Sequence, residues 1–113
     1  MESILSSIKK LLGIADDYVH FDMDIIMHIN SVLAVLTQLG IGPPDGFVVK
    51  DDNDTWESFI SDTSKIEMIK SYVFLKVKLL FDPPLNSSVL ESYNRSIDEF
   101  EWRLNFLAET TNE

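Results

Sequence analysis

Few side chains in this chain could do chemistry: it contains two histidines and no cysteine. His20 lies between two apolar stretches, and His28 follows Asp24 by about one helical turn. A histidine and an aspartate spaced in this way can supply two ligands to a metal ion, whereas protein zinc sites take three or four. The sequence suggests no further ligand, so we interpret both histidines as surface or boundary residues.

The acidic string DDND at 51–54 is similar to the start of a calcium-binding loop. Asp51, Asn53 and Thr55 stand at the alternating ligand positions, and Asp62 stands at the twelfth. Trp56, however, occupies the sixth position, where the sharp turn of such a loop requires glycine. We therefore predict no metal site in this string.

No other catalytic pattern is present in the sequence. It has no glycine-rich phosphate loop and no nucleophile elbow. The paired acids Asp16-Asp17 and Glu99/Glu101 are typical of solvated faces, because neither pair has a partner suited to acid–base catalysis. The prediction is a protein that is not an enzyme and that uses no cofactor.

The charge of the chain is its strongest compositional feature: 113 residues carry a net charge of −10. Of the 19 acids, eleven lie in 1–62, together with only three of the nine bases. Such a surface repels the phosphates of nucleic acid, so specific DNA binding is not expected. The acids could increase solubility, line a passage through which DNA slides, or mimic DNA. No apolar run reaches the roughly 18 residues that a membrane span requires.

The segment 64–81 organises the predicted fold. On a helix it places apolar residues on two nearly opposite sides, so other helices must cover it on several sides. Ser64 and Glu67 have the spacing of a capping box at its start, and Asp82-Pro83-Pro84 ends it. We expect this helix to be the central rod of a small helical domain.

The remaining segments complete an all-α prediction of one domain, 1–113. Main helices are expected at 2–12, 22–39, 64–81 and 88–108, with a short helix near 55–60, a possible β-hairpin arm near 46–50 and a partly mobile tail at 109–113. The first of these helices is amphipathic, with Lys9 and Lys10 on its polar side, and Gly13 is placed to end it. Two further capping boxes, Asp54/Glu57 and Ser88/Glu91, are predicted to start the short helix and the last helix. The last helix carries a heptad-spaced seam made of Leu90, Tyr93, Ile97, Phe100, Leu104 and Leu107. Trp102 and Phe106 lie off this seam, so they need a second cover, which another subunit could provide.

Several strings taken together resemble a known family. They are FDMDIIMHINSVL at 21–33 with LTQLGIGPP at 36–44, TWESF at 55–59, YVFLKVKLLFDPP at 72–84 and DEFEWRLN at 98–105. This pattern of helices and breaks is similar to the small all-α head–tail connector proteins of tailed phages and Gram-positive prophages, also called head-completion or adaptor proteins. The resemblance covers nearly the whole chain in order.

The resemblance implies a structural virion protein, made in the host bacterial cytoplasm and located at the head–tail interface. Such proteins form a ring, commonly dodecameric, beneath the portal, extend the DNA channel without binding DNA specifically, and dock a further connector, stopper or tail-terminator protein. It implies portal contact at the C-terminal end of the chain, through Trp102, Arg103, Phe106 and Glu109. It also implies contact with a neighbouring subunit or the next connector through Phe47, Val48, Val49, Lys50 and Asp51.

The acidic composition also supports an alternative of another class. The chain could be a DNA mimic that inhibits a host or phage enzyme by occupying a basic cleft. A salt-sensitive complex with a DNA-binding enzyme would favour this alternative.

Overall fold

The computed structural model describes residues 2–111, with side chains described as far as residue 106. This part of the chain forms five α-helices and one 3-10 turn: α1 (Ile4–Leu12), α2 (Asp22–Gln38), α3 (Trp56–Phe59), η1 (Thr63–Lys65), α4 (Ile66–Phe81) and α5 (Ser87–Thr111). The all-α prediction is confirmed. The last helix is longer than predicted and runs through 109–111, the first residues of the predicted mobile tail.

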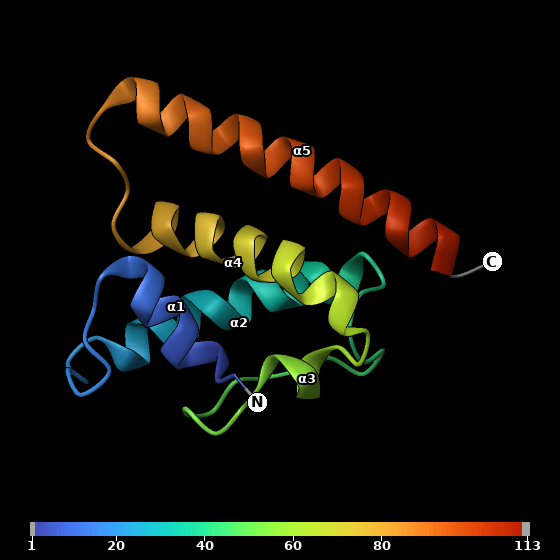
Figure 1. Cartoon of the computed structure of the whole chain (residues 1–113), viewed down its shortest axis with the longest axis horizontal. Coiled ribbons are helices and arrows are strands. Elements are labelled where there is room, and N and C mark those ends of the chain that lie inside the picture. Colours follow the sequence, from blue (N-terminus) through green and yellow to red (C-terminus); the bar gives the residue numbers. More distant parts are fainter. Residues whose placement is uncertain (1, 112–113) are drawn as a thin grey trace.

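Helix α4 lies at the centre of the fold, where it contacts α1, α2 and α5 (Figure 1). Five of its residues are buried: Ile66, Ile69, Tyr72, Val73 and Val77. Partly buried residues on the other side of the helix, among them Met68, Leu75 and Leu79, also pack against the core, so several neighbours are needed to cover the helix. The prediction that this segment is the central rod is therefore confirmed.

Helix α1 ends as its sequence predicts, but one of its lysines does not face solvent. Gly13 adopts the left-handed conformation, with φ 81°, that closes the helix. Lys9 was expected on the polar face with Lys10, yet Lys9 is 1% exposed. Its ammonium group lies 2.9 Å from the Asp22 carboxylate and donates to the Asp16 carbonyl at 3.0 Å. These two partners allow the charge to be buried where α1 meets the loop that leads to α2.

The predicted β-hairpin arm near 46–50 is wrong: residues 46–50 contain no strand. The physical reason is the side chain of Asn30 on α2. The backbone N–H of Val49 donates to Asn30 Oδ1 at 2.8 Å, and Asn30 Nδ2 donates to the Val49 carbonyl at 3.0 Å. A single carboxamide therefore satisfies the backbone groups that a partner strand would otherwise satisfy.

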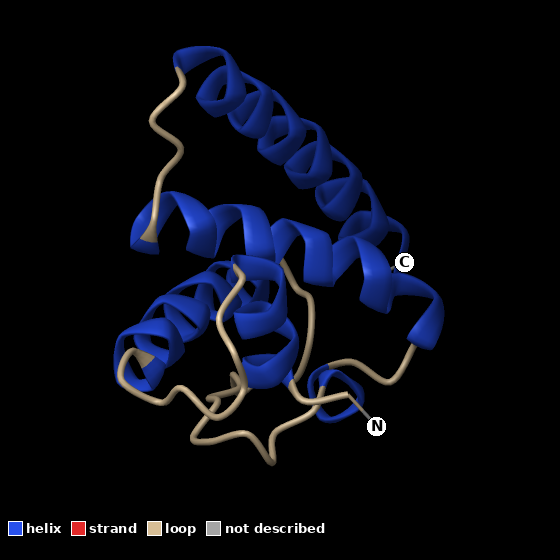
Figure 2. Ribbon diagram, turned by 60° about the vertical axis from the view of Figure 1, so that its left-hand side comes forward, coloured by secondary structure: helices blue, strands red, loops and turns tan. Residues whose placement is uncertain are grey.

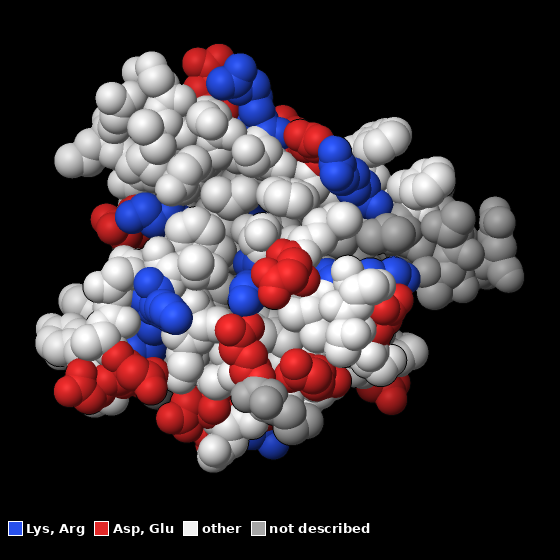
Figure 3. Space-filling view, in the orientation of Figure 1, with Lys and Arg blue, Asp and Glu red and all other residues white. Residues whose placement is uncertain are grey.

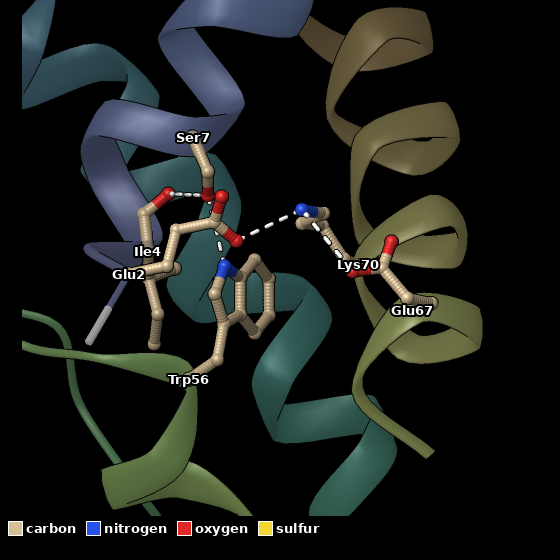
Figure 4. Close-up of polar contacts among 6 residues, drawn as sticks. All are labelled: Glu2, Ile4, Ser7, Trp56, Glu67 and Lys70. Atoms are coloured by element: carbon tan, nitrogen blue, oxygen red, sulfur yellow. Dashed lines mark hydrogen bonds and ion pairs between the residues drawn. The ribbon is translucent and has the colours of Figure 1, made fainter. Parts of the chain in front are cut away.

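The N-terminal segment is paired with the start of α3. Ile4 N–H donates to the Asp54 carbonyl at 2.9 Å, and Trp56 N–H donates to the Glu2 carbonyl at 3.2 Å. The indole of Trp56, which is fully buried, donates to Ser7 Oγ at 2.8 Å (Figure 4). These bonds fix the long connection between α2 and α4 against the first helix.

An ion pair extends this link to the central helix. Lys70 of α4 donates to Glu2 at 2.8 Å and lies 3.7 Å from Glu67, as Figure 4 shows. The hydrogen bond to Glu2 raises the pKa of Lys70 above its ordinary value. The pair is partly exposed, so its contribution to stability is small.

The helices begin at caps other than the three predicted capping boxes. Asp62 accepts from Ser64 N–H at 3.0 Å and from Ser64 Oγ at 2.6 Å, so η1 starts before the predicted cap. These hydrogen bonds lower the pKa of Asp62. Asn86 accepts from Ser88 N–H at 2.8 Å, and Thr55 caps α3. Each cap lies one or two residues from the predicted one because Asn, Asp and Thr side chains compete for the same amides.

Helix α5 covers α4 unevenly. The two helices are close near the C-terminal end of α5 and diverge toward the linker that joins them (Figures 1 and 2). Among its described side chains, only Ile97 and Leu104 are buried. Tyr72 of α4 donates to Glu101 of α5 at 2.8 Å. Burial raises the pKa of Tyr72, and the hydrogen bond to Glu101 raises it further.

Candidate interaction surfaces

The outer side of α5 carries an exposed pair of aromatic residues. The side chains of Trp102 and Phe106 are 70% and 57% exposed, and their rings stack with centroids 6.3 Å apart. They lie on the side opposite Leu104, which is buried against the domain. We call Asp98, Trp102 and Phe106, which follow one another at one-turn intervals, the aromatic face.

The residues predicted to contact the portal fall on this part of α5. Trp102, Arg103 and Phe106 are all exposed, and Arg103 pairs with Glu99 at 2.6 Å. The side chain of Glu109 lies outside the described residues. The structure thus brings three predicted residues together on one exposed helical segment, and the protein that they contact stays a prediction.

Residues 47–51 were predicted to contact a neighbouring subunit or the next connector. They differ in exposure, because Val49 is bonded to Asn30 of α2. Val49 is buried, and Phe47 is half-buried against Phe59 with ring centroids 5.5 Å apart. Val48, Lys50 and Asp51 are exposed. Three of these five predicted residues are therefore available to a partner, and their partner also stays a prediction.

Sequence reasoning missed an apolar surface beside α2. Met23 and Met27 are 81% and 58% exposed, one helical turn apart.

Two hollows flank this side of the helix and share Ser31. The first, of about 580 Å³, is lined by Met23, Ile26, Met27, Asn30, Ser31 and Lys50. The second, of about 300 Å³, is lined by Ser31, Val32, Val35, Lys76, Leu79 and Leu80. We call the two hollows together the α2 groove. The two methionines at i and i+4 on the polar side of the helix were the signal for it in the sequence.

The histidines pack among aromatic rings. The His20 ring lies 4.8 Å from Phe21 and the His28 ring 6.4 Å from Phe81, in both cases between centroids. Across the described residues, no group of three His, Cys, Asp or Glu side chains is arranged to hold a metal ion.

The carboxylates of the 51–54 string bond to their own backbone. Asp54 Oδ2 accepts from Lys50 N–H at 2.7 Å, and Asp51 Oδ1 accepts from Asn53 N–H at 2.8 Å. These bonds define a turn that the carboxylates hold closed through their own backbone.

A further hollow of about 440 Å³ lies between the α2–α3 connection and the C-terminal half of α5. It is lined by Gly40, Ile41, Gly42, Pro43, Glu57, Ser58, Phe59, Ile60, Ser61, Asp62, Lys65, Ile69 and Leu104. Among its described lining residues, no serine or threonine hydroxyl stands beside a histidine, the usual pairing of nucleophile and base.

The charges of the molecule are distributed unevenly over its surface. In Figure 3, acidic side chains gather over the lower half of the view, below α4, whereas α5 along the top carries both signs of charge. The exposed acids of the N-terminal half include Asp16, Asp17, Asp24, Asp51 and Asp52. One part of the surface is therefore suited to repel DNA, and the aromatic face is not part of it.

Comparison with known proteins identifies the family. The family model described as phage connector protein matches residues 4–111, which span all five α-helices. Comparisons with curated proteins and with solved structures give no match. Within the part of the chain that the structure describes, no helix combines the length and apolarity needed to cross a membrane. Since the match extends over almost the whole sequence, the chain belongs to the phage connector protein family.

Proposed function

We propose that this chain forms a ring beneath the portal of the phage head, extends the DNA channel there and docks the next connector or tail protein. Membership of the phage connector family supports the coarser statement, a structural role at the head–tail joint of the virion. The observation that carries the proposal is the match over residues 4–111, because it includes every element of the fold.

The physical properties of the chain support a ring. Among the described residues, Trp102 and Phe106 on one helix and Met23 and Met27 on another are exposed, so a monomer presents more than one apolar surface to other molecules. A ring subunit needs two such surfaces, because each copy has a neighbour on either side.

The charge supports the proposed channel. With a net charge of −10, a ring of many copies presents a strongly acidic body to passing DNA. Like-charge repulsion then keeps the phosphate backbone from adhering to the channel wall. In this proposal the chain holds no cofactor and catalyses no reaction.

A complementation experiment tests the function. A phage with a nonsense codon early in this gene would be grown with and without a plasmid that supplies the chain. Without the plasmid we expect DNA-filled heads and free tails that do not join, and with it infectious particles. Normal tailed particles without the chain would overturn the proposal. That outcome, together with a salt-sensitive complex between the chain and a DNA-binding enzyme, would support the DNA-mimic alternative.

A further inference from the structure

The two exposed apolar surfaces of the chain are complementary to each other. We infer that the aromatic face of one copy docks in the α2 groove of the next copy, an inference that rests on the ring proposed above. The two surfaces belong to different helices, and in the described part of the chain Trp102 and Met23 are 70% and 81% exposed.

The spacing of the two surfaces is the same. Trp102 and Phe106 are one turn apart on α5, and Met23 and Met27 are one turn apart on α2. Rows of side chains at i and i+4 are the ridges that interlock when two helices pack. Methionine sulfur also makes favourable contacts with aromatic rings, and its flexible side chain adapts to their shape.

The one charged residue of the aromatic face, Asp98, is opposite in sign to the charged residues that line the α2 groove. In a chain with 19 acids and nine bases, Lys50 and Lys76 are the only charged residues among the described ones that line the α2 groove. Neither lysine has an ion-pair partner among the described residues. On the aromatic face, Asp98 is exposed and likewise unpaired within the described part of the chain. The unpaired Asp98 carboxylate on the aromatic face therefore suits the two lysines of the groove.

Pairing of unlike surfaces has a consequence for assembly. A contact between two aromatic faces would be satisfied in a dimer, whereas a contact from aromatic face to α2 groove leaves one surface free on each end copy. Such head-to-tail contacts add subunits until the rotation closes a ring. The inferred pairing thus supplies the type of interface that the proposed ring needs.

Cysteine cross-linking tests the pairing directly, because the chain has no natural cysteine. A Met27→Cys, Phe106→Cys chain would be treated with a short bismaleimide, both as purified protein and in phage particles. We expect a ladder of covalent multimers from it. Each single variant should give dimers at most, and the control Lys10→Cys, Phe106→Cys should give no ladder. No ladder from the test pair, or cross-linking of Phe106→Cys to the portal instead, would overturn the inference.

A mixing experiment separates the pairing from the function. A Trp102→Ala, Phe106→Ala chain keeps only the groove, and a Met23→Glu, Met27→Glu chain keeps only the aromatic face. Each variant alone should self-associate about 30-fold more weakly than the parent, as loss of an interface hot spot does. Their mixture should form a one-to-one dimer and nothing larger, as measured by light scattering.

The two experiments distinguish failure of the inferred pairing from failure of the proposed function. The absence of a dimer in the mixture, although both variants melt like the parent, would contradict the inferred pairing. Dimers in the mixture, without the chain in any phage particle, would remove the proposed function and leave the pairing in place. If the chain were present in particles but Met27→Cys and Phe106→Cys gave no cross-link there, the proposed function would stand and the inferred pairing would be removed.

Discussion

Helices α4 and α5 differ in how much of their apolar surface the chain itself covers. Helix α4 has 16 residues, of which five are buried, and it contacts three other α-helices. Helix α5 has 25 residues, yet only Ile97 and Leu104 are buried among its described side chains. Both helices carry apolar seams in the sequence. The difference shows that α4 builds the domain, whereas much of the described part of α5 stays exposed, and we propose that this exposed part contacts another subunit.

The largest expected effect contrasts these two helices directly. Val73→Asp on α4 should unfold the domain or destabilise it by about 4 kcal/mol or more, because it buries an unpaired charge. Trp102→Asp on α5 should change the free energy of unfolding by less than about 0.5 kcal/mol, as surface substitutions usually do. Urea unfolding followed by circular dichroism measures both values. Similar losses in the two variants would remove the distinction between the helices.

The next largest effect on the free energy of unfolding is expected at the buried ion pair between Lys9 of α1 and Asp22 of α2. Asp22→Asn leaves the Lys9 ammonium buried without its carboxylate and should destabilise the fold by about 3 kcal/mol or more. Lys9→Met serves as the comparison and should cost less, because the Asp22 side chain is 24% exposed and only its Oδ1 atom is buried, whereas the Lys9 side chain is 2% exposed. If the Lys9→Met chain were the less stable of the two, burial of the charge would not be what limits stability here.

A smaller loss of stability is expected at Asn30, whose side chain bonds the Val49 backbone groups that a partner strand would otherwise bond. Asn30→Ala removes both hydrogen bonds to the Val49 backbone and should cost about 2 kcal/mol. Amide hydrogen exchange should show faster exchange at Val49 in this variant, since its N–H loses its acceptor. Ser31→Ala on the same helix is the matched control. Unchanged protection at Val49 would mean that the segment is held by packing alone.

Among the contacts inside the domain, the smallest expected effect lies between α4 and α5. Tyr72→Phe removes one hydrogen bond to Glu101 and should cost about 1 kcal/mol at pH 7. Since the pKa of Tyr72 is raised in the folded protein, its contribution is complete below the ordinary tyrosine value, near pH 10, and is lost as the pH rises through the folded pKa. The difference between parent and variant should therefore shrink in urea melts above about pH 10. A difference that grew with pH would contradict the direction of this shift.

Much of the fold could be predicted from the sequence because helices are local. Apolar periodicity placed every main helix, and Gly13 and Asp82-Pro83-Pro84 marked helix ends correctly. The cap residues were misplaced by one or two positions, since several Asn, Asp, Ser and Thr side chains stand near each helix start. Lys9 was assigned to solvent because its partners come from the following segment and are recognised only in three dimensions.

The surfaces were harder to predict than the helices. The exposure of Trp102 and Phe106 followed from their position off the heptad seam, and the structure places both on the outer side of α5. The predicted β arm was wrong because its backbone bonds to Asn30, which is 19 residues away in the sequence. The α2 groove was missed because it combines two helices and the segment around Lys50. Periodicity within one helix does not reveal a surface built from several segments.

The central claim, that the chain is a structural part of the head–tail joint, is tested most directly by its location. Tailed particles, DNA-filled heads and free protein from a phage lysate would be separated on a gradient, and the chain would be quantified in each fraction against the portal protein by mass spectrometry. We predict a fixed ratio near one copy per portal subunit in tailed particles, together with its presence in DNA-filled heads that lack tails. Its confinement to the free-protein fraction would contradict the claim.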